Sequence, residues 1–155
     1  MATSNVLLRG LTTADVPAIQ RIDALNTKDR GQRQGTELWS LMAETTTSFG
    51  AEVDGKLAGF VLADVRPWEF GARESVGWII AIGVDPAYKG RGIGRLLGER
   101  VVQQFRKLGV RHFSTLVEES DTQLLGYFKT LGFKESPRVV LEMSVPGSPP
   151  PAHDA

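Results

Sequence analysis

The sequence contains no cysteine among its 155 residues. This excludes disulfide bonds, thiolate metal ligands and a cysteine nucleophile. It also has no apolar run close to the roughly 20 residues that a helix needs to span a bilayer. The amino terminus, MATSNVLLRGLTTAD, lacks the basic region and long apolar stretch of a secretory signal peptide. We therefore expect a cytoplasmic protein with no membrane contact.

An excess of charge of either sign is missing too, since 18 Lys and Arg residues balance 18 Asp and Glu residues. Proteins dedicated to nucleic acids normally carry a basic surplus, so we expect no nucleic-acid partner. The length suits one domain with a substantial core. The carboxyl end, PGSPPPAHDA, is rich in proline and poor in apolar residues. Residues 147–155 are therefore predicted to be a disordered tail, behind a single domain at residues 1–146.

Hydrophobic periodicity predicts both strands and helices along the chain. The predicted strands are residues 5–9, 47–53, 57–65, 75–84, 112–118 and 138–145. The predicted helices are residues 12–25, 36–44, 92–108 and 120–131. Asp54-Gly55 is a strong signal for a hairpin turn between the second and third strands. This order of elements predicts an α/β domain with a mixed sheet.

A glycine-rich turn, Lys89-Gly90-Arg91-Gly92-Ile93-Gly94, separates the strand at 75–84 from the following helix. The first amides of a helix lack intrahelical partners and lie at the positive end of its dipole. Glycine lets such amides touch a phosphate without an intervening Cβ. Six basic residues and one acidic residue lie within residues 89–107, which favours a polyphosphate. A plain strand-to-helix turn with a solvated charged face is the other interpretation.

Three kinds of nucleotide site use glycines in this way. A P-loop needs Gly-Lys followed by Ser or Thr, whereas an arginine follows Gly94. A Rossmann dinucleotide site has Gly92, Gly94 and Gly98 in its favour. However, the glycine turn of a Rossmann site follows its strand directly, whereas residues 85–89 intervene in this chain. In addition, too little chain remains after the turn for a doubly wound sheet. The remaining option is the pyrophosphate of an acyl-CoA.

The stretch IIAIGVDPAYKGRGIGRLLGERVV, at residues 79–102, resembles the acyl-CoA signature of the GNAT acetyltransferase superfamily. That signature is Arg/Gln-x-x-Gly-x-Gly/Ala after a strand ending in Val-x-Pro. The stretch SDTQLLGYFKTLGFKE, at residues 120–135, resembles the family's Asn-x-x-Ala-x-x-Leu-Tyr-x-x-x-Gly-Phe segment. With the element order, the resemblance covers roughly residues 5–145. It implies a single-domain GNAT-like fold, with a mixed central sheet of about six or seven strands flanked by about four helices.

The resemblance implies an N-acetyltransferase that moves an acetyl group from acetyl-CoA to an amine by direct attack, with no covalent intermediate and no metal. The strand at 75–84 would be bulged and splayed from the next strand, and its backbone would pair with the pantetheine arm. Backbone amides of Gly83 and Val84 would polarise the thioester carbonyl. The residues implied in acyl-CoA binding are Ile82, Gly83, Val84, Lys89, Gly90, Arg91, Gly92, Ile93, Gly94, Arg95 and Asp121.

The chain departs from the family pattern at three positions. Lys89 replaces the usual Arg or Gln, with little expected effect because that residue acts through its backbone. Asp121 replaces Asn, and its simplest role is to cap the following helix. Phe128 aligns with the Tyr that often protonates the departing thiolate, and Tyr127 lies about 100° away around the helix. We therefore expect Phe128 in the core and no positioned acid.

Glu74 is the candidate general base. Some members of the family carry Glu near the position of Val76, and Glu74 lies two residues earlier on the same strand face. A solvated turn residue is the other interpretation of Glu74. Because Phe128 replaces the usual acid and Glu74 also fits a solvated turn, a non-catalytic acyl-CoA-binding sensor is the alternative function.

Acceptor recognition is expected from residues 26–35, 36–44 and 66–74. Three aromatic residues there fit an acceptor channel, a homodimer contact or core packing alike: Trp39, Trp68 and Phe70. A basic cluster in the first segment disfavours a polycationic acceptor: Lys28, Arg30 and Arg33. A protein amino terminus, a lysine, a polyamine, an amino acid and a drug all stay open as acceptors.

Overall fold

A computed structural model describes residues 5–26, 36–66 and 75–148. The strands in these ranges are β1 (Val6–Gly10), β2 (Phe49–Val53), β3 (Lys56–Arg66), β4 (Val76–Val84) and β5 (His112–Thr115). The α-helices are α1 (Val16–Asn26), α2 (Thr36–Ala43), α3 (Ile93–Lys107) and α4 (Thr122–Thr130). None of the helices in these ranges has the length and apolarity needed to cross a membrane.

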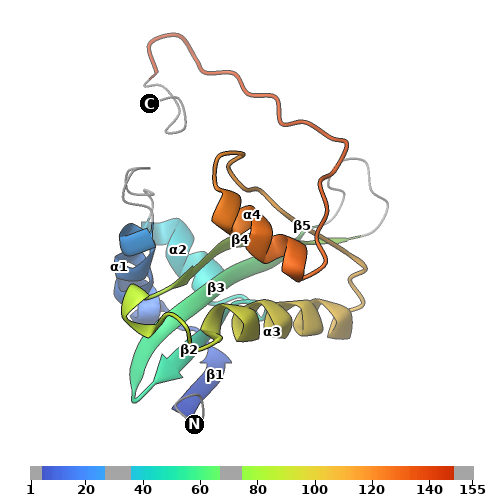
Figure 1. Ribbon diagram of the computed structural model, residues 1–155. Coiled ribbons are helices and arrows are strands. Elements are labelled where there is room, and N and C mark those ends of the chain that lie inside the picture. Colours follow the sequence, from blue (N-terminus) through green and yellow to red (C-terminus); the bar gives the residue numbers. More distant parts are fainter. Residues whose placement is uncertain (1–4, 27–35, 67–74, 149–155) are drawn as a thin grey trace.

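The described strands form one sheet in the order β1-β2-β3-β4-β5 (Figure 1). Neighbours from β1 to β4 are antiparallel, whereas β4 and β5 are parallel. The predicted mixed α/β sheet is therefore confirmed. The predicted hairpin is confirmed as well, because Asp54 and Gly55 both have positive φ angles, 50° and 79°, between β2 and β3.

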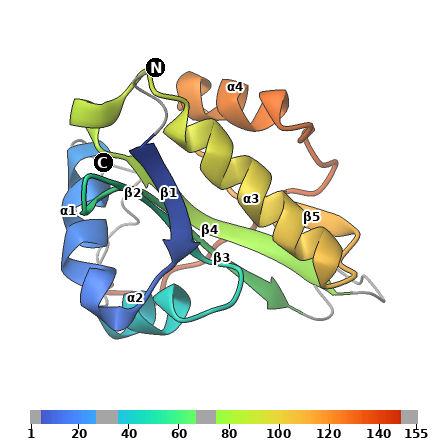
Figure 2. The same cartoon turned by 90° about the horizontal axis from the view of Figure 1, so that it is seen from below.

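Helices cover both faces of the sheet (Figures 1 and 2). On one face, Phe105 of α3 and Phe128 of α4 join a core cluster with Ile79. On the other face, Ile22 of α1 packs in a second cluster with Phe60. Both clusters are built from buried residues, so the central strands are buried on both faces as their nearly continuous apolar sequence predicts.

A bulge in β4 changes which face its side chains occupy. Leu62 of β3 is opposite Ala81, but the next residue, Ala63, is opposite Ile79. Ile80 is therefore an extra residue without a partner in the register. In consequence Ile79 packs in the α3 cluster and Ala81 in the α1 cluster, although they are two residues apart. The bulge expected from the family resemblance is confirmed.

The prediction of a final strand at 138–145 is wrong. The described residues after α4 form no strand. Val139, Leu141, Met143 and Val145, which alternate as a strand face would, are 78%, 89%, 92% and 68% exposed. Alternation shows that one face of a segment would be apolar, but a strand also needs a neighbour that supplies hydrogen bonds. The sheet thus has five described strands rather than six or seven, while the expected four helices are present.

Candidate functional site

The two parallel strands part halfway along β4. Their pairing runs from Val76↔His112 to Ile79↔Thr115 and then stops. Among the described residues, the remainder of β4 pairs only with β3. The hydroxyl of Thr115 donates to the carbonyl oxygen of Ile79 at 2.9 Å, at the point of separation. The splay expected from the resemblance is confirmed, and we call the open edge of residues 80–84 the slot.

Hydrogen-bond alternation shows which backbone groups face the slot. The amide of Asp85 donates to Ala58 of β3 at 2.8 Å. Because successive residues of a strand point their backbone groups to opposite sides, Gly83 also faces β3, whereas Ile82 and Val84 face the slot. The side-chain amide of Asn26 donates to the Val84 carbonyl at 2.9 Å, which leaves the Val84 N–H directed into the slot.

Gly83 therefore contributes space rather than an amide to the site. A Cβ on Gly83 would lie 2.9 Å from a ring carbon of Phe60, so glycine is required there by packing. The expectation that the Gly83 amide polarises a carbonyl in the slot is not supported by this geometry. Ile82 takes its place beside Val84 as a residue whose N–H faces the slot.

A buried carboxylate anchors the turn that leaves β4. Asp85 is 7% exposed and accepts hydrogen bonds from the amide of Ala87, at 2.9 Å, and from the guanidinium of Arg21 on α1, at 3.1 Å. These two donors, the Ala87 amide foremost, hold the pKa of Asp85 below its usual value. The short 3-10 helix that follows, Pro86–Tyr88, is thereby fixed against both β4 and α1.

The glycine turn forms a cradle of free amides, defined as residues 90–95, because the Lys89 amide already donates to the Pro86 carbonyl. Gly90 and Gly92 have φ angles of 83° and 75°, which L side chains rarely adopt. The first helical bond of α3 runs from Leu96 N to Gly92 O, so the amides before Leu96 lack intrahelical partners. A Cβ on Gly90 or Gly92 would meet no atom within 4 Å. The cradle thus faces open space, and its donors fit an anion such as a pyrophosphate.

Cationic side chains surround the cradle. The guanidinium of Arg91 lies over the ring of Tyr88, 5.2 Å from its centre, which holds the positive charge beside the turn. Arg95 forms an exposed ion pair with Glu99 one turn further along α3, at 2.8 Å. Lys89 is exposed. These charges add to the positive end of the α3 dipole and favour a polyanion.

Helix α4 confirms two of the predicted roles. The carboxylate of Asp121 accepts from the Leu124 amide at 3.1 Å, so Asp121 caps α4. Phe128 is 4% exposed, and its ring centre lies 5.2 Å from that of Phe133. Phe128 is therefore a core residue with no group that can donate a proton.

Sequence reasoning missed the role of Tyr127. Its hydroxyl donates to the carbonyl oxygen of Gly94, in the cradle, at 2.6 Å. Gly98 makes this approach possible, because a Cβ on Gly98 would collide with the Tyr127 hydroxyl and lie 2.7 Å from Leu131. The signal was present as a glycine inside an otherwise regular helix, which often marks close packing.

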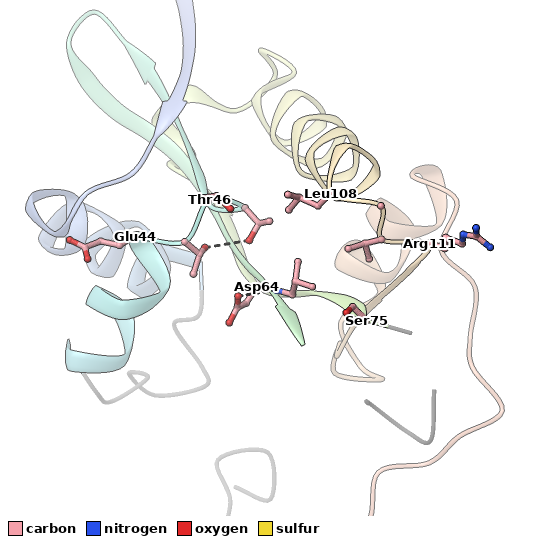
Figure 3. Close-up of a pocket in the computed structure, with 11 residues that line it drawn as sticks. Glu44, Thr46, Asp64, Ser75, Leu108 and Arg111 are labelled. Atoms are coloured by element: carbon pink, nitrogen blue, oxygen red, sulfur yellow. Dashed lines mark hydrogen bonds between the residues drawn. The ribbon is translucent and has the colours of Figure 1, made fainter. Parts of the chain in front are cut away.

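One hollow lies along the paired part of β4 and β5 and reaches Thr115, at the inner end of the slot. It has a volume of about 900 Å³ and is lined by Trp78 of β4, by residues 111–117, by Phe128 and by residues 133–136, among others. A second hollow of about 710 Å³ lies just before the start of β4, between Asp64, Ser75 and the end of α3 (Figure 3). The second is separated from the cradle by the length of α3, so only the first is part of the candidate site.

Several predicted residues fall outside the described ranges: Lys28, Arg30, Arg33, Trp68, Phe70 and Glu74. Trp39 is described, and it is 5% exposed with its ring 6.2 Å from that of Phe60. Packing is thus the role that the structure gives Trp39. Within residues 5–26, 36–66 and 75–148, no group of three or more His, Asp or Glu residues is placed to hold a metal ion.

Comparisons with known proteins agree with this geometry. Residues 17–133 match the profile of the acetyltransferase (GNAT) family, which is more than half of the chain. The chain therefore belongs to the GNAT acetyltransferase family. It is similar to the ribosomal protein bS18 alanine N-acetyltransferase of Escherichia coli strain K12, at 27% identity, covering 83% of this chain and 81% of that protein.

Other relatives align over shorter stretches. An uncharacterized N-acetyltransferase of Methanocaldococcus jannaschii is 32% identical over 63% of this chain, and a mycothiol acetyltransferase of Thermomonospora curvata is 33% identical over 63%. The chain spans only 43% and 31% of the length of these two relatives. Among solved structures, the aminoglycoside N-acetyltransferase AAC(6')-Iy in complex with CoA has a TM-score of 0.73 at 20% identity, covering 90% of this chain and 94% of that one. That similarity concerns the fold.

Proposed function

We propose that the protein is an N-acetyltransferase that uses acetyl-CoA as its donor and acetylates an amine by direct attack. The observation that carries this proposal is the continuity of two features. An open strand edge with outward amides at Ile82 and Val84 leads, through the turn anchored by Asp85, into a cradle of free amides at residues 90–95. An acyl-CoA has a peptide-like arm followed by a pyrophosphate, and these two features match it in that order.

Acetyl-CoA supplies an acetyl group already activated as a thioester. The backbone of Ile82 and Val84 binds the amide-bearing arm as an added strand would bind, because both residues present an N–H to the slot. The Val84 N–H is the donor best placed to stabilise negative charge on a carbonyl oxygen held there. The cradle binds the pyrophosphate, with Arg91 held beside it by Tyr88.

In the proposed reaction the nitrogen of the acceptor forms a bond to the acetyl carbon, and the carbon–sulfur bond breaks. Glu74 is proposed to take the proton from the acceptor amine, through a water molecule. The sulfur leaves as a thiolate and is protonated by solvent. A thiol with a pKa near about 8.5 is an adequate leaving group at neutral pH without a positioned acid.

The acceptor is proposed to carry few positive charges. Four cationic side chains, Arg111, Lys129, Lys134 and Arg138, line the hollow beside the slot, against two acidic ones, Glu119 and Glu135. This balance repels polyamines and aminoglycosides more than it repels a peptide amino terminus. The similar Escherichia coli enzyme is named for N-acetylation of an alanine of ribosomal protein bS18, which is also a protein acceptor.

A donor-binding and thiol-release experiment tests the proposal. At a concentration 100 times its dissociation constant, acetyl-CoA should stabilise the fold by about 2.7 kcal/mol, which a thermal shift detects. The protein is then given acetyl-CoA with a panel of acceptors: alanine-initiated peptides, amino acids, a polyamine and an aminoglycoside. Thiol release with the peptides is expected. Absence of any thermal shift refutes acetyl-CoA binding, whereas a shift without thiol release from any acceptor favours the sensor function.

A further inference from the structure

We propose that Tyr127 is a positioning residue for the donor's pyrophosphate, acting through the first turn of α3. This inference rests on the proposed acetyl-CoA function and adds a residue to it. The hydroxyl of Tyr127 donates to the carbonyl oxygen of Gly94 at 2.6 Å. The N–H of Arg95 belongs to the same peptide group as that carbonyl. The hydrogen bond therefore fixes the plane of one of the peptides that line the cradle.

The Arg95 amide is one of the free donors of the cradle. It lies one residue before Leu96, whose amide makes the first helical bond to Gly92. A hydrogen bond accepted by a carbonyl polarises its peptide group and strengthens the N–H on the other side. Tyr127 thus both orients the Arg95 amide and improves it as a donor, although its own hydroxyl does not reach the ligand.

The environment of Tyr127 keeps its hydroxyl a donor. The ring packs edge-on against Phe128, with 5.1 Å between ring centres. Burial first, and the nearby charge of Glu99 second, raise the pKa of Tyr127 above its usual value. The proton consequently stays on the oxygen throughout the neutral pH range, and the contact with Gly94 does not switch off as the pH rises through 9.

Gly98 is the second half of this arrangement. Gly98 lies one turn beyond Gly94 on α3, and a Cβ at that position would occupy the place of the Tyr127 hydroxyl. A side chain on Gly98 would therefore displace the hydroxyl and release the Gly94 carbonyl. Tyr127→Phe and Gly98→Ala should therefore both release the Gly94 carbonyl, so a double-mutant cycle can test the proposal.

The test compares two ligands that share the pantetheine arm, CoA and pantetheine, of which only CoA carries the pyrophosphate. Wild type, Tyr127→Phe and Gly98→Ala are titrated with each. Tyr127→Phe should weaken CoA binding by about fivefold, the effect of losing one hydrogen bond of roughly 1 kcal/mol. Pantetheine binding should be unchanged. In an amide NMR spectrum, inorganic pyrophosphate should shift the Arg95 resonance of wild type more than that of Tyr127→Phe.

Thr47→Val is the matched control. Thr47 is 2% exposed, and its hydroxyl also donates to a backbone carbonyl, that of Ala63, at 2.7 Å. It lies before β2 and away from the cradle, so its loss should lower stability without changing CoA affinity. In the cycle, Gly98→Ala should weaken CoA binding less in the Tyr127→Phe background than in wild type.

Unchanged CoA affinity in Tyr127→Phe overturns the positioning role. So does an equal loss of CoA and pantetheine binding, which would indicate a general structural effect. If wild type itself fails to bind CoA, the proposed function falls together with this inference. If wild type binds CoA but the substitutions leave the ratio of CoA affinity to pantetheine affinity unchanged, the inference alone is wrong.

Discussion

The hydroxyl of Thr115 on β5 holds the carbonyl of Ile79 on β4, at 2.9 Å, where the two strands separate. A side chain here replaces the backbone partner that β5 no longer provides. The bond also marks the inner end of the slot, since residues 80–84 beyond it have no strand partner on that side among the described residues. The width of the slot at its base thus depends on one hydroxyl group.

Thr115→Val should leave the shape of the side chain nearly unchanged and remove this bond. We expect a loss of about 0.5–1.5 kcal/mol in the free energy of unfolding. We also expect slower acetyl transfer, because the base of the slot is no longer fixed. CoA affinity measured by titration should change little, since the cradle is at the other end of the slot. Wild-type turnover in this variant would show that the Thr115 contact does not shape the slot.

Gly92→Ala should strain the cradle, because its φ of 75° is unfavourable for an L side chain. The expected cost is about 1–2 kcal/mol in stability, together with weaker acetyl-CoA binding. Gly109→Ala is the control, since Gly109 has a φ of 77° and lies beyond the opposite end of α3. Equal CoA affinity in the two variants, measured by titration, would contradict the assignment of the cradle.

Asp85 should make stability depend on acid pH. Its pKa is lowered in the folded state by the Ala87 amide and then by Arg21, so the unfolded value of about 3.9 is the higher of the two. The stabilisation is therefore complete above the unfolded value and is lost as the pH falls through the folded one. Urea unfolding between about pH 5 and 3 should show this decline, and Asp85→Asn should make it shallower.

Asp15 provides the comparison for that experiment. Its pKa is also lowered, chiefly by the hydrogen bond from Arg9, but it lies before α1 and contacts β1 rather than the turn after β4. Asp15→Asn should reduce the same acid slope while leaving CoA affinity intact. An identical slope in wild type and Asp85→Asn would show that the Asp85 contacts contribute nothing to stability.

Phe128→Ala should cost about 3–5 kcal/mol in the free energy of unfolding, because it removes a buried aromatic ring between α4 and α3. Denaturant titration measures this directly. A loss of turnover without a loss of stability would instead indicate that Phe128 takes part in catalysis.

Glu74→Gln should lower turnover by about 10²- to 10⁴-fold, the usual contribution of a general base, with acetyl-CoA affinity nearly unchanged. Steady-state rates with a confirmed acceptor, together with donor titrations, check this prediction. If turnover in Glu74→Gln equals that of wild type, the amine loses its proton to solvent or to another group.

Local signals predicted much of this fold well. Asp54-Gly55 requires positive φ at two successive positions, and the hairpin follows from that requirement alone. The cradle was predictable for the same reason, because Gly90 and Gly92 adopt conformations that few other residues tolerate. The cap at Asp121 and the burial of Phe128 likewise depend on neighbours within one or two helical turns.

Features that depend on distant contacts were not predictable. The Gly83 amide points toward β3 rather than into the slot, and this orientation depends on the register with β3. The hydrogen bond of Tyr127 joins residues 33 positions apart. The alternation at 138–145 predicts a strand, but whether such a segment pairs depends on whether it meets a free sheet edge.

The bulge at Ile80 makes the side-chain alternation of β4 sensitive to insertions and deletions. Before the bulge Ile79 faces the α3 cluster, and after it Ala81 faces the α1 cluster and Ile82 the α3 cluster. The extra residue, Ile80, shifts the alternation so that the side chains of both halves of β4 lie on their proper faces. Removing one residue of β4 other than Ile80 would put one half of the strand on the wrong face, with Ile79 or Ala81 directed at the other core. Removing Ile80 itself would leave a regular strand with both halves still on their correct faces. A gap within β4 in an alignment of this chain with its relatives therefore belongs at Ile80.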